Sequence, residues 1–314
     1  MANCHDLFIQ FNDNLNILES KLSDLLESRR ALRKTIKNYF SKEHKEYKPL
    51  FTTQGSYVLG TIIRTKEDSC DLDDGVYFDK KPEGSSAILQ GWIHDAVKDQ
   101  TDGGSKQKNK CVRVFYKANY HIDIPVYYKI EELQNPELAT RYNGYKKSDP
   151  KEFIDWFKNS PNKCDQLDRT IKYLKAWCDK EPKRMLTGLA ITVLAEELFV
   201  SNDQDDLALS NLLHALHDRL LNRWTCIMPT APADDLLEKY DQVFKDNFLE
   251  SLRVFKIDAK SAIDETDKSR ACKKWKKHLG KYFDDCEELE EEKRAHNSTF
   301  IIGSAKESKP WLNE

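Results

Sequence analysis

Strand-like sequence is confined to one part of this 314-residue chain. Short runs rich in β-branched and aromatic residues, with alternating polar and apolar positions, begin only beyond Pro49; they read LDDGVYF, CVRVFY and YHIDIPVYY. After Pro150 such runs nearly vanish, and apolar residues recur at helical spacing. Strands followed by helices are typical of an α+β protein. We therefore expect a sheet-containing lobe at residues 1–150 and a helical lobe at residues 151–314.

Helical spacing also precedes the strands. From Phe11 to Ile36, apolar residues fall three or four positions apart, which predicts one long helix from about Leu7 to Tyr39. Because the stripe ends after a single helix, we favour packing across its own domain over a coiled-coil partner. Further helices are predicted within SSAILQGWIHDAVKDQ and over residues 165–179, 187–200, 207–222, 234–257 and 268–294.

Composition excludes several classes of protein. Fifty Lys and Arg residues against 53 acids give a net charge of −3, which offers no overall attraction to nucleic acid or to an anionic membrane. The eight cysteines form no CxxC pair and accompany no His cluster, so we expect reduced thiols in a cytoplasmic protein. The N-terminus lacks the pattern of a signal peptide, and no window approaches the roughly 18 apolar residues of a membrane span.

Acidic residues occupy unusual places in two of the predicted strands. In DLDDG, side-chain alternation puts Asp71 and Asp73 on one face of a strand, where two carboxylates repel each other. In YHIDIPVYY, Asp123 lies between Ile122 and Ile124. Carboxylate oxygens suit Mg²⁺, with Mn²⁺ as a second option, and three acids from neighbouring strands fit a two-metal site.

A Gly-Ser turn lies upstream of these acids, with Asp71 fifteen positions after Ser56. Gly55 has no Cβ to obstruct a ligand, and Ser56 adds a hydroxyl beside the amides of the turn, so the pair predicts a phosphate cradle. The Walker pattern GxxxxGK[ST] is absent. Turn and acids together predict a nucleoside triphosphate site with carboxylates for its metals.

These motifs resemble the nucleotidyltransferases of the polymerase-β superfamily. TQGSYVLGT, CDLDDGVYF and HIDIPVYY look like the bacterial cGAS/DncV-like nucleotidyltransferases (CD-NTases), which make cyclic oligonucleotide signals in anti-phage (CBASS) defence. The resemblance implies a polymerase-β-like lobe with a mixed sheet, a helical lobe and an active site in the cleft between them. It also implies ATP and GTP as substrates and a cyclic product read by a separate effector protein, without a membrane or stable nucleic-acid partner.

The resemblance assigns residues to roles. Gln54, Gly55 and Ser56 would lie at the triphosphate, and Asp71, Asp73 and Asp123 would be the catalytic, metal-binding carboxylates. In the helical lobe, Lys175 and Thr187 match a lysine and a small hydroxyl that grip the triphosphate in the family, although the family more often has serine at the second position. Asp74 faces away from Asp71 and Asp73 by strand alternation and is expected to be structural.

Two other functions fit the same motifs. An enzyme that adds nucleotides to RNA 3′ ends without a template would share the site, but would need a basic channel, against which the net charge of −3 argues. A catalytically inactive nucleotide-binding scaffold would have no reason to keep three mutually repelling carboxylates. The sequence leaves open the bases, the linkage and the ring size of a cyclic product.

Overall fold

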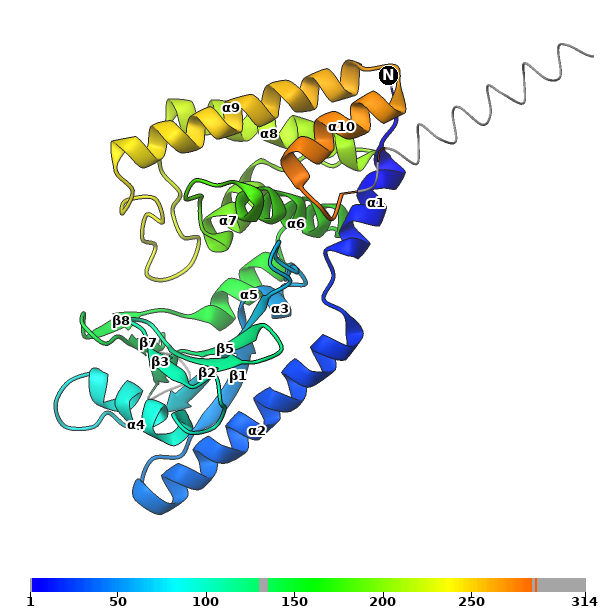
Figure 1. The fold of residues 1–314 in the computed structure, drawn as a ribbon. Helices are drawn as coiled ribbons and strands as arrows, with labels where there is room; N and C mark the ends of the chain where they lie inside the picture. The colour runs from blue at the N-terminus through cyan, green and yellow to red at the C-terminus, as the bar shows by residue number, and fades with distance from the viewer. Residues whose placement is uncertain (1, 130–134, 284–285, 287–314) are drawn as a thin grey trace, which may run out of the picture.

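A computed structural model describes residues 2–129, 135–283 and 286 of the chain as two lobes (Figure 1). The elements of the sheet lobe are α2 (Glu19–Glu43), β1 (Leu50–Gln54), α3 (Gly55–Val58), β2 (Cys70–Phe78), α4 (Ala87–Val97), β3 (Ser105–Gln107), β4 (Val112–Tyr116), β5 (Tyr120–Ile124), β6 (Val126–Tyr128), β7 (Glu137–Ala139) and β8 (Tyr145–Lys147). The other helices are α1 (His5–Asn14), α5 (Pro150–Lys158), α6 (Asp165–Lys180), α7 (Gly188–Leu198), α8 (Asp205–Asn222), α9 (Gln242–Asp264) and α10 (Lys268–Leu279).

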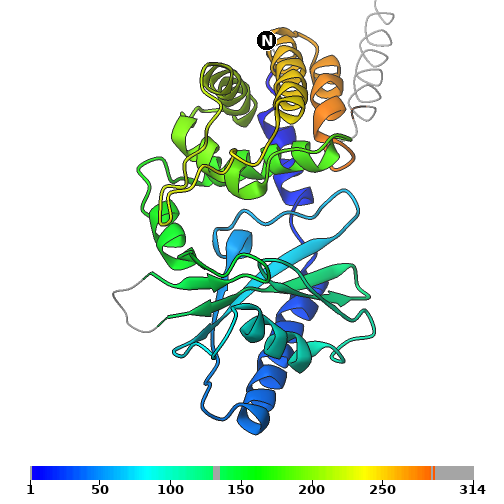
Figure 2. The same cartoon turned by 90° about the vertical axis from the view of Figure 1, so that its left-hand side faces the viewer.

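One mixed sheet forms the centre of the first lobe, in the order β3-β4-β5-β2-β6-β7-β8, with β1 also paired to β2. One face of β2 carries Leu72 and Val76, which pack with side chains of α2 and α4 into a buried core. The opposite face carries Asp71 and Asp73, and Figure 2 shows that this side of the sheet faces the helical lobe. The alternation of β2 thus separates its core residues from its acids.

The helical lobe has its own core, and the first helix of the chain belongs to it. Phe8 and Phe11 of α1 are fully buried there, and Phe8 lies edge-on to Trp275 at 5.0 Å between ring centroids. The phenolic hydroxyl of Tyr173 on α6 donates to the backbone carbonyl of Phe8 at 2.8 Å. An aromatic cluster therefore fastens α1 to α6 and α10.

The predicted uninterrupted helix from Leu7 to Tyr39 is wrong, because α1 ends at Asn14 and α2 begins at Glu19. Leu15 is buried in the core of the helical lobe, whereas Ile17 packs against the core of the sheet lobe. The apolar residues of this stripe pack in two different cores, so the helix is interrupted between Asn14 and Glu19, where the chain passes from one core to the other. The placement of the whole N-terminal helix in the first lobe therefore fails for α1.

Other boundaries also differ from the predictions. Residues 236–239 form turns and Asp235 forms an isolated β-bridge with Ile227, so α9 begins eight positions later than predicted, at Gln242. α5 occupies a stretch where no helix was predicted. α10 ends at Leu279, and most of its predicted extension to residue 294 lies outside the described residues. Helices α6, α7 and α8 lie within two residues of their predicted bounds.

The prediction that all eight cysteines are reduced is wrong for two of them. Cys272 and Cys286 form a disulfide, with their Cα atoms 5.7 Å apart, and the remaining six are free. Fourteen positions separate the two residues, and the turn after α10 brings them together, which sequence spacing does not reveal. Among the described residues, no helix combines the length and the apolar character needed to cross a membrane.

Candidate active site

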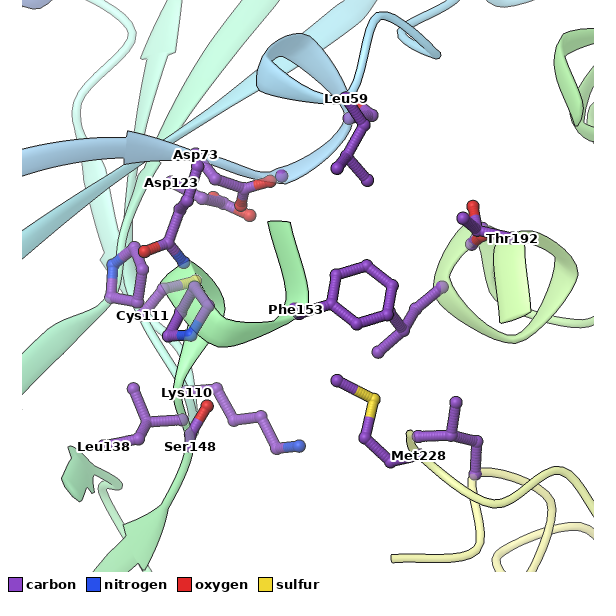
Figure 3. A pocket seen from close by; sticks show the side chains of 18 of the residues that line it. Leu59, Asp73, Lys110, Cys111, Asp123, Leu138, Ser148, Phe153, Thr192 and Met228 are labelled. Carbon is purple, nitrogen blue, oxygen red and sulfur yellow. The ribbon is translucent and has the colours of Figure 1, made fainter. Parts of the chain in front are cut away.

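The three predicted carboxylates lie side by side on the sheet. β2 and β5 are parallel, and their register places Asp73 beside Asp123 and Asp71 beside His121. Asp71, Asp73 and Asp123 all line one large cavity between the lobes (Figure 3). The structure therefore brings together the acids that the sequence predicts to converge.

The carboxyl of Asp73 lies in an environment that disfavours its negative charge. The pKa of its carboxyl is raised to about 7, first by burial and then by the negative charges of Asp71 and Asp123. Arg113 and Lys175 act against this rise with their positive charges. A carboxyl whose charge is this unfavourable in the protein alone gains from a bound cation.

The Gly-Ser turn directly adjoins Asp73. Gln54 of β1 pairs with Asp73 of β2, and Gly55 follows with a φ of 72°, which favours glycine. A Cβ on Gly55 would lie 2.1 Å from Oδ2 of Asp73, so a side chain here and the carboxylate could not occupy their present places together. The backbone of the turn and the acids thus form one continuous surface, which includes Ser56.

Gln54 has a second, structural contact. Its side chain is buried and its Nε2 donates to the hydroxyl of Tyr127 on β6 at 3.0 Å, while its Oε1 has no hydrogen-bond partner among the described residues. Gln54 lines the cavity, but its amide is oriented by the sheet.

Arg113 is a residue of the site that the sequence analysis missed. It lies on β4 opposite Asp123, and its Nε and Nη2 donate to the two carboxylate oxygens of Asp123 at 2.6 Å each. In the described part of the chain, no three His, Cys, Asp or Glu side chains are grouped tightly enough to hold a metal ion. Arg113 neutralises Asp123 in this arrangement and draws its carboxylate toward β4. No local sequence pattern identifies Arg113, because its contact with Asp123 depends on the pairing of β4 with β5.

The two predicted residues of the helical lobe differ in position. Lys175 lines the cavity, and its Nζ donates to the backbone carbonyl and the hydroxyl of Thr61, both at 3.0 Å. Burial lowers the pKa of Lys175 to about 8, against the pull of Asp71. Thr187 is exposed and caps α7 by accepting from the amide of Ala190 at 3.4 Å, whereas the next residue, Gly188, lines the cavity.

Asp74 lies on the other face of β2, as strand alternation predicts. Arg33 of α2 donates to its two carboxylate oxygens from Nε and Nη2 at 2.7 and 2.5 Å. Thr53 of β1 donates to the same carboxylate at 3.0 Å. This partly buried ion pair joins α2 to the sheet and leaves Asp74 outside the cavity.

The cavity itself has a volume of about 1340 Å³ and draws its walls from both lobes. Its apolar lining includes Leu59, Phe153, Leu186, Leu189 and Met228. Figure 3 shows Asp73 and Asp123 on one side of the cavity, with Phe153, Thr192 and Met228 across from them. The volume exceeds the roughly 300–1,000 Å³ typical of a site for one small ligand.

Comparison with known proteins shows what this chain is similar to. Residues 49–127 match the model of the nucleotidyltransferase domain of cyclic GMP-AMP synthase DncV-like proteins. The fold is similar to that of Vibrio cholerae DncV cyclic AMP-GMP synthase, a prokaryotic cGAS homolog, with a TM-score of 0.79 and 19% identity over 91% of this chain and 98% of that one. The same enzyme in complex with the linear intermediate 5′ pppA(3′,5′)pG also matches with a TM-score of 0.79 and 19% identity, over 91% of this chain and 97% of that one.

These matches confirm the predicted α+β nucleotidyltransferase fold with its mixed sheet. The matched segment runs from just before β1 to β6 and so includes the Gly-Ser turn, Asp71, Asp73 and Asp123. Residues 49–127 are therefore similar to the DncV-like nucleotidyltransferase domain, and the chain has the fold of the DncV enzyme.

Proposed function

We propose that this protein synthesises a cyclic oligonucleotide from nucleoside triphosphates, with ATP and GTP as the first candidates. The observation that carries the proposal is the convergence of Asp71, Asp73 and Asp123 beside the Gly55 turn, in a cavity larger than one small ligand requires. By its resemblance to the CD-NTases, we propose a cytoplasmic role in anti-phage (CBASS) defence, with the product read by a separate effector protein.

The donor set at the site fits magnesium. The three side chains offer only carboxylate oxygens, which Mg²⁺ prefers, and the pKa of Asp73 is raised by burial and by the negative charges of Asp71 and Asp123. We propose that Asp71, Asp73 and Asp123 hold Mg²⁺ ions, for which Mn²⁺ can substitute. Bound there, the ions would lower the pKa of an attacking ribose hydroxyl and neutralise the charge of the leaving pyrophosphate.

The residues of the chain supply binding and orientation. Backbone amides of the Gly55 turn and the hydroxyl of Ser56 would donate to the donor triphosphate, and Lys175 would add a positive charge from the helical lobe. The ribose hydroxyl of the acceptor nucleotide attacks the α-phosphate of the donor, and the bond to pyrophosphate breaks. A second reaction of the same kind closes the ring, so catalysis requires positioning and charge stabilisation but no protein nucleophile.

The role of Thr187 is weaker in this proposal than that of Lys175. Its hydroxyl oxygen is the cap of α7, and its side chain lies outside the lining of the cavity. To bind a triphosphate, the hydroxyl of Thr187 would have to give up its hydrogen bond with the amide of Ala190.

The test is incubation of the purified protein with the four nucleoside triphosphates and Mg²⁺ or Mn²⁺, followed by phosphatase treatment and mass spectrometry. Small phosphatase-resistant products are expected, and their masses name the bases. A ladder of products on added RNA, with no small product, would instead show the RNA 3′-end activity. Nucleotide binding without product under any of these conditions would favour the inactive scaffold.

Metal binding is expected to depend on pH through Asp73. Its pKa of about 7 means that the metal-free carboxyl is protonated below pH 7, and a metal must displace that proton. Apparent Mn²⁺ affinity, measured by electron paramagnetic resonance, should fall about tenfold per pH unit below pH 7 and level off above it. An affinity unchanged between pH 5.5 and 8 would contradict this assignment, and Asp73→Asn should remove the dependence.

A further inference from the structure

A loop of the sheet lobe reaches the helical lobe beside the candidate active site. Residues 60–69, which we call the bridging loop, connect α3 to β2 and therefore lie between the Gly-Ser turn and Asp71. Figure 2 shows this loop, in light blue, extending from the sheet toward the helical lobe. Its residues that line the large cavity are Thr61, Ile62, Ile63 and Thr65. The position of the bridging loop thus shapes one wall of the proposed nucleotide site.

The first residues of the bridging loop contact two candidates for phosphate binding. Thr61 is fully buried, and its amide donates to the backbone carbonyl of Ser56 at 2.9 Å. The carbonyl and the hydroxyl of Thr61 accept the hydrogen bonds from Nζ of Lys175 that were described above. A movement of the bridging loop at Thr61 would therefore shift Lys175 relative to the Gly-Ser turn.

The later residues of the bridging loop contact Tyr282, which follows α10. The hydroxyl of Tyr282 donates to the backbone carbonyl of Thr65 at 3.1 Å, and the guanidinium of Arg64 lies over its ring, 4.7 Å from the centroid. Nε of Arg64 also donates to Oδ1 of Asp68 at 2.6 Å, so the guanidinium is held between a carboxylate and the ring. A hydrogen bond and a cation–π contact thus join one side chain of the helical lobe to the bridging loop.

Tyr282 itself is fixed within the helical lobe. The next residue, Phe283, is buried in the aromatic cluster of that lobe, with its ring centroid 5.2 Å from that of Phe8. Nδ2 of Asn14 on α1 donates to the backbone carbonyl of Tyr282 at 3.0 Å. The disulfide described above ties this segment to α10. Loss of the contact would therefore free the bridging loop rather than the backbone of Tyr282.

We propose that Tyr282 is a positioning residue for the nucleotide site: it holds the bridging loop in place, and the loop, through Thr61, sets the position of Lys175. Tyr282 lines neither cavity, so it acts through the loop and not on the nucleotide. This inference rests on the proposed function, because it concerns how the donor nucleotide is held. It also gives the contact between the lobes a role in binding, since the residue lies in one lobe and the loop belongs to the other.

The first test measures how readily the bridging loop opens, by amide hydrogen exchange, and needs no activity. The amides of Arg64 and Thr65, which donate to the backbone carbonyls of Leu15 and Ser69 at 2.8 and 2.9 Å, report on the loop. Tyr282→Phe removes only the hydroxyl, so these amides should exchange about 2- to 10-fold faster than in the wild type. Tyr282→Ala also removes the ring and should accelerate them further. Unchanged exchange of both amides in Tyr282→Phe and in Tyr282→Ala would overturn the proposal.

Tyr142→Phe and Tyr142→Ala are the matched controls. The ring of Tyr142 also lies under an arginine, with the guanidinium of Arg141 5.2 Å from its centroid, but Tyr142 lies between β7 and β8 and lines neither cavity. The same two changes there should leave the exchange of the bridging loop as in the wild type. Equally fast exchange in these controls would refute a role specific to Tyr282.

The second test asks whether the effect of Tyr282 reaches the nucleotide through Lys175. The affinity for a nonhydrolysable ATP analogue with Mg²⁺ is measured by calorimetry in the wild type, Tyr282→Phe, Lys175→Ala and the double variant. We expect Tyr282→Phe to weaken binding about 2- to 10-fold when Lys175 is present, and to have no effect in the Lys175→Ala background. An equal loss in both backgrounds, which a general loss of stability would cause, would refute the positioning role. Failure of the wild type to bind the analogue would count against the proposed function, and the exchange experiment would still decide whether Tyr282 holds the loop.

Discussion

Replacing Asp71 and Asp73 by asparagine is expected to reduce nucleotide incorporation by at least about a thousandfold. The two side chains share the cavity face of β2 next to Asp123, and amide groups cannot supply the anionic oxygens that Mg²⁺ requires. Incorporation of labelled nucleotide into phosphatase-resistant product measures the loss. The fold should persist, because asparagine fits the same space and removes two mutually repelling charges.

Asp79→Asn is the matched control for this variant. Asp79 directly follows β2 and is exposed, so the same chemical change there should leave incorporation unchanged. If the double variant kept more than about a tenth of the wild-type rate, the assignment of these carboxylates to catalysis would fail. If biological protection survived the loss of incorporation, the protein would act as a scaffold.

Gly55→Ala is expected to lower activity by about a hundredfold through displacement of Asp73. The new Cβ would stand 2.1 Å from Oδ2 of Asp73, so the carboxylate must move, and a shift of about 1 Å at a reacting centre costs on the order of 10²-fold in rate. Because alanine disfavours the φ of 72°, the substitution should also lower the free energy of unfolding by about 1 kcal/mol. Steady-state kinetics and thermal unfolding measure the two effects separately.

Gly91→Ala provides the comparison. Gly91 lies inside α4, where an added Cβ meets no atom within 4 Å, so this change should leave activity intact and stabilise the protein by about 0.5–1 kcal/mol. Wild-type kinetics in Gly55→Ala would show that the turn tolerates a side chain and that the close approach of Asp73 has no role.

The acids of the site could be predicted from the sequence because the direction of their side chains follows from alternation within a single strand. Alternation along a strand puts Asp71 with Asp73 and turns Asp74 away, and the parallel register of β2 and β5 only had to bring Asp123 alongside. Arg113 was missed because its significance depends on pairing between β4 and β5, which a single sequence does not specify. The hydrogen bond from Lys175 to Thr61 joins residues 114 positions apart and leaves no local pattern at all.

The predicted fold was wrong where the residues of one apolar pattern pack in two different cores. Phe11 and Leu15 continue the same helical spacing as Leu25 and Leu32, yet the first pair packs in the helical lobe and the second under the sheet. Hydrophobic periodicity indicates that a residue is buried, but it does not indicate which core the residue packs in.

The division of the N-terminal region between the lobes has a mechanical consequence. The chain passes from the helical lobe to the sheet lobe between α1 and α2, and returns between β8 and α5, so two covalent connections join the lobes within the described residues. A rigid-body rotation that opens or closes the cavity must keep both connections intact, and its axis therefore passes close to the line between them. We therefore expect the lobes to move as a hinge about this axis. Substitutions at residues 15–18, none of which lines the cavity, should alter how freely it opens.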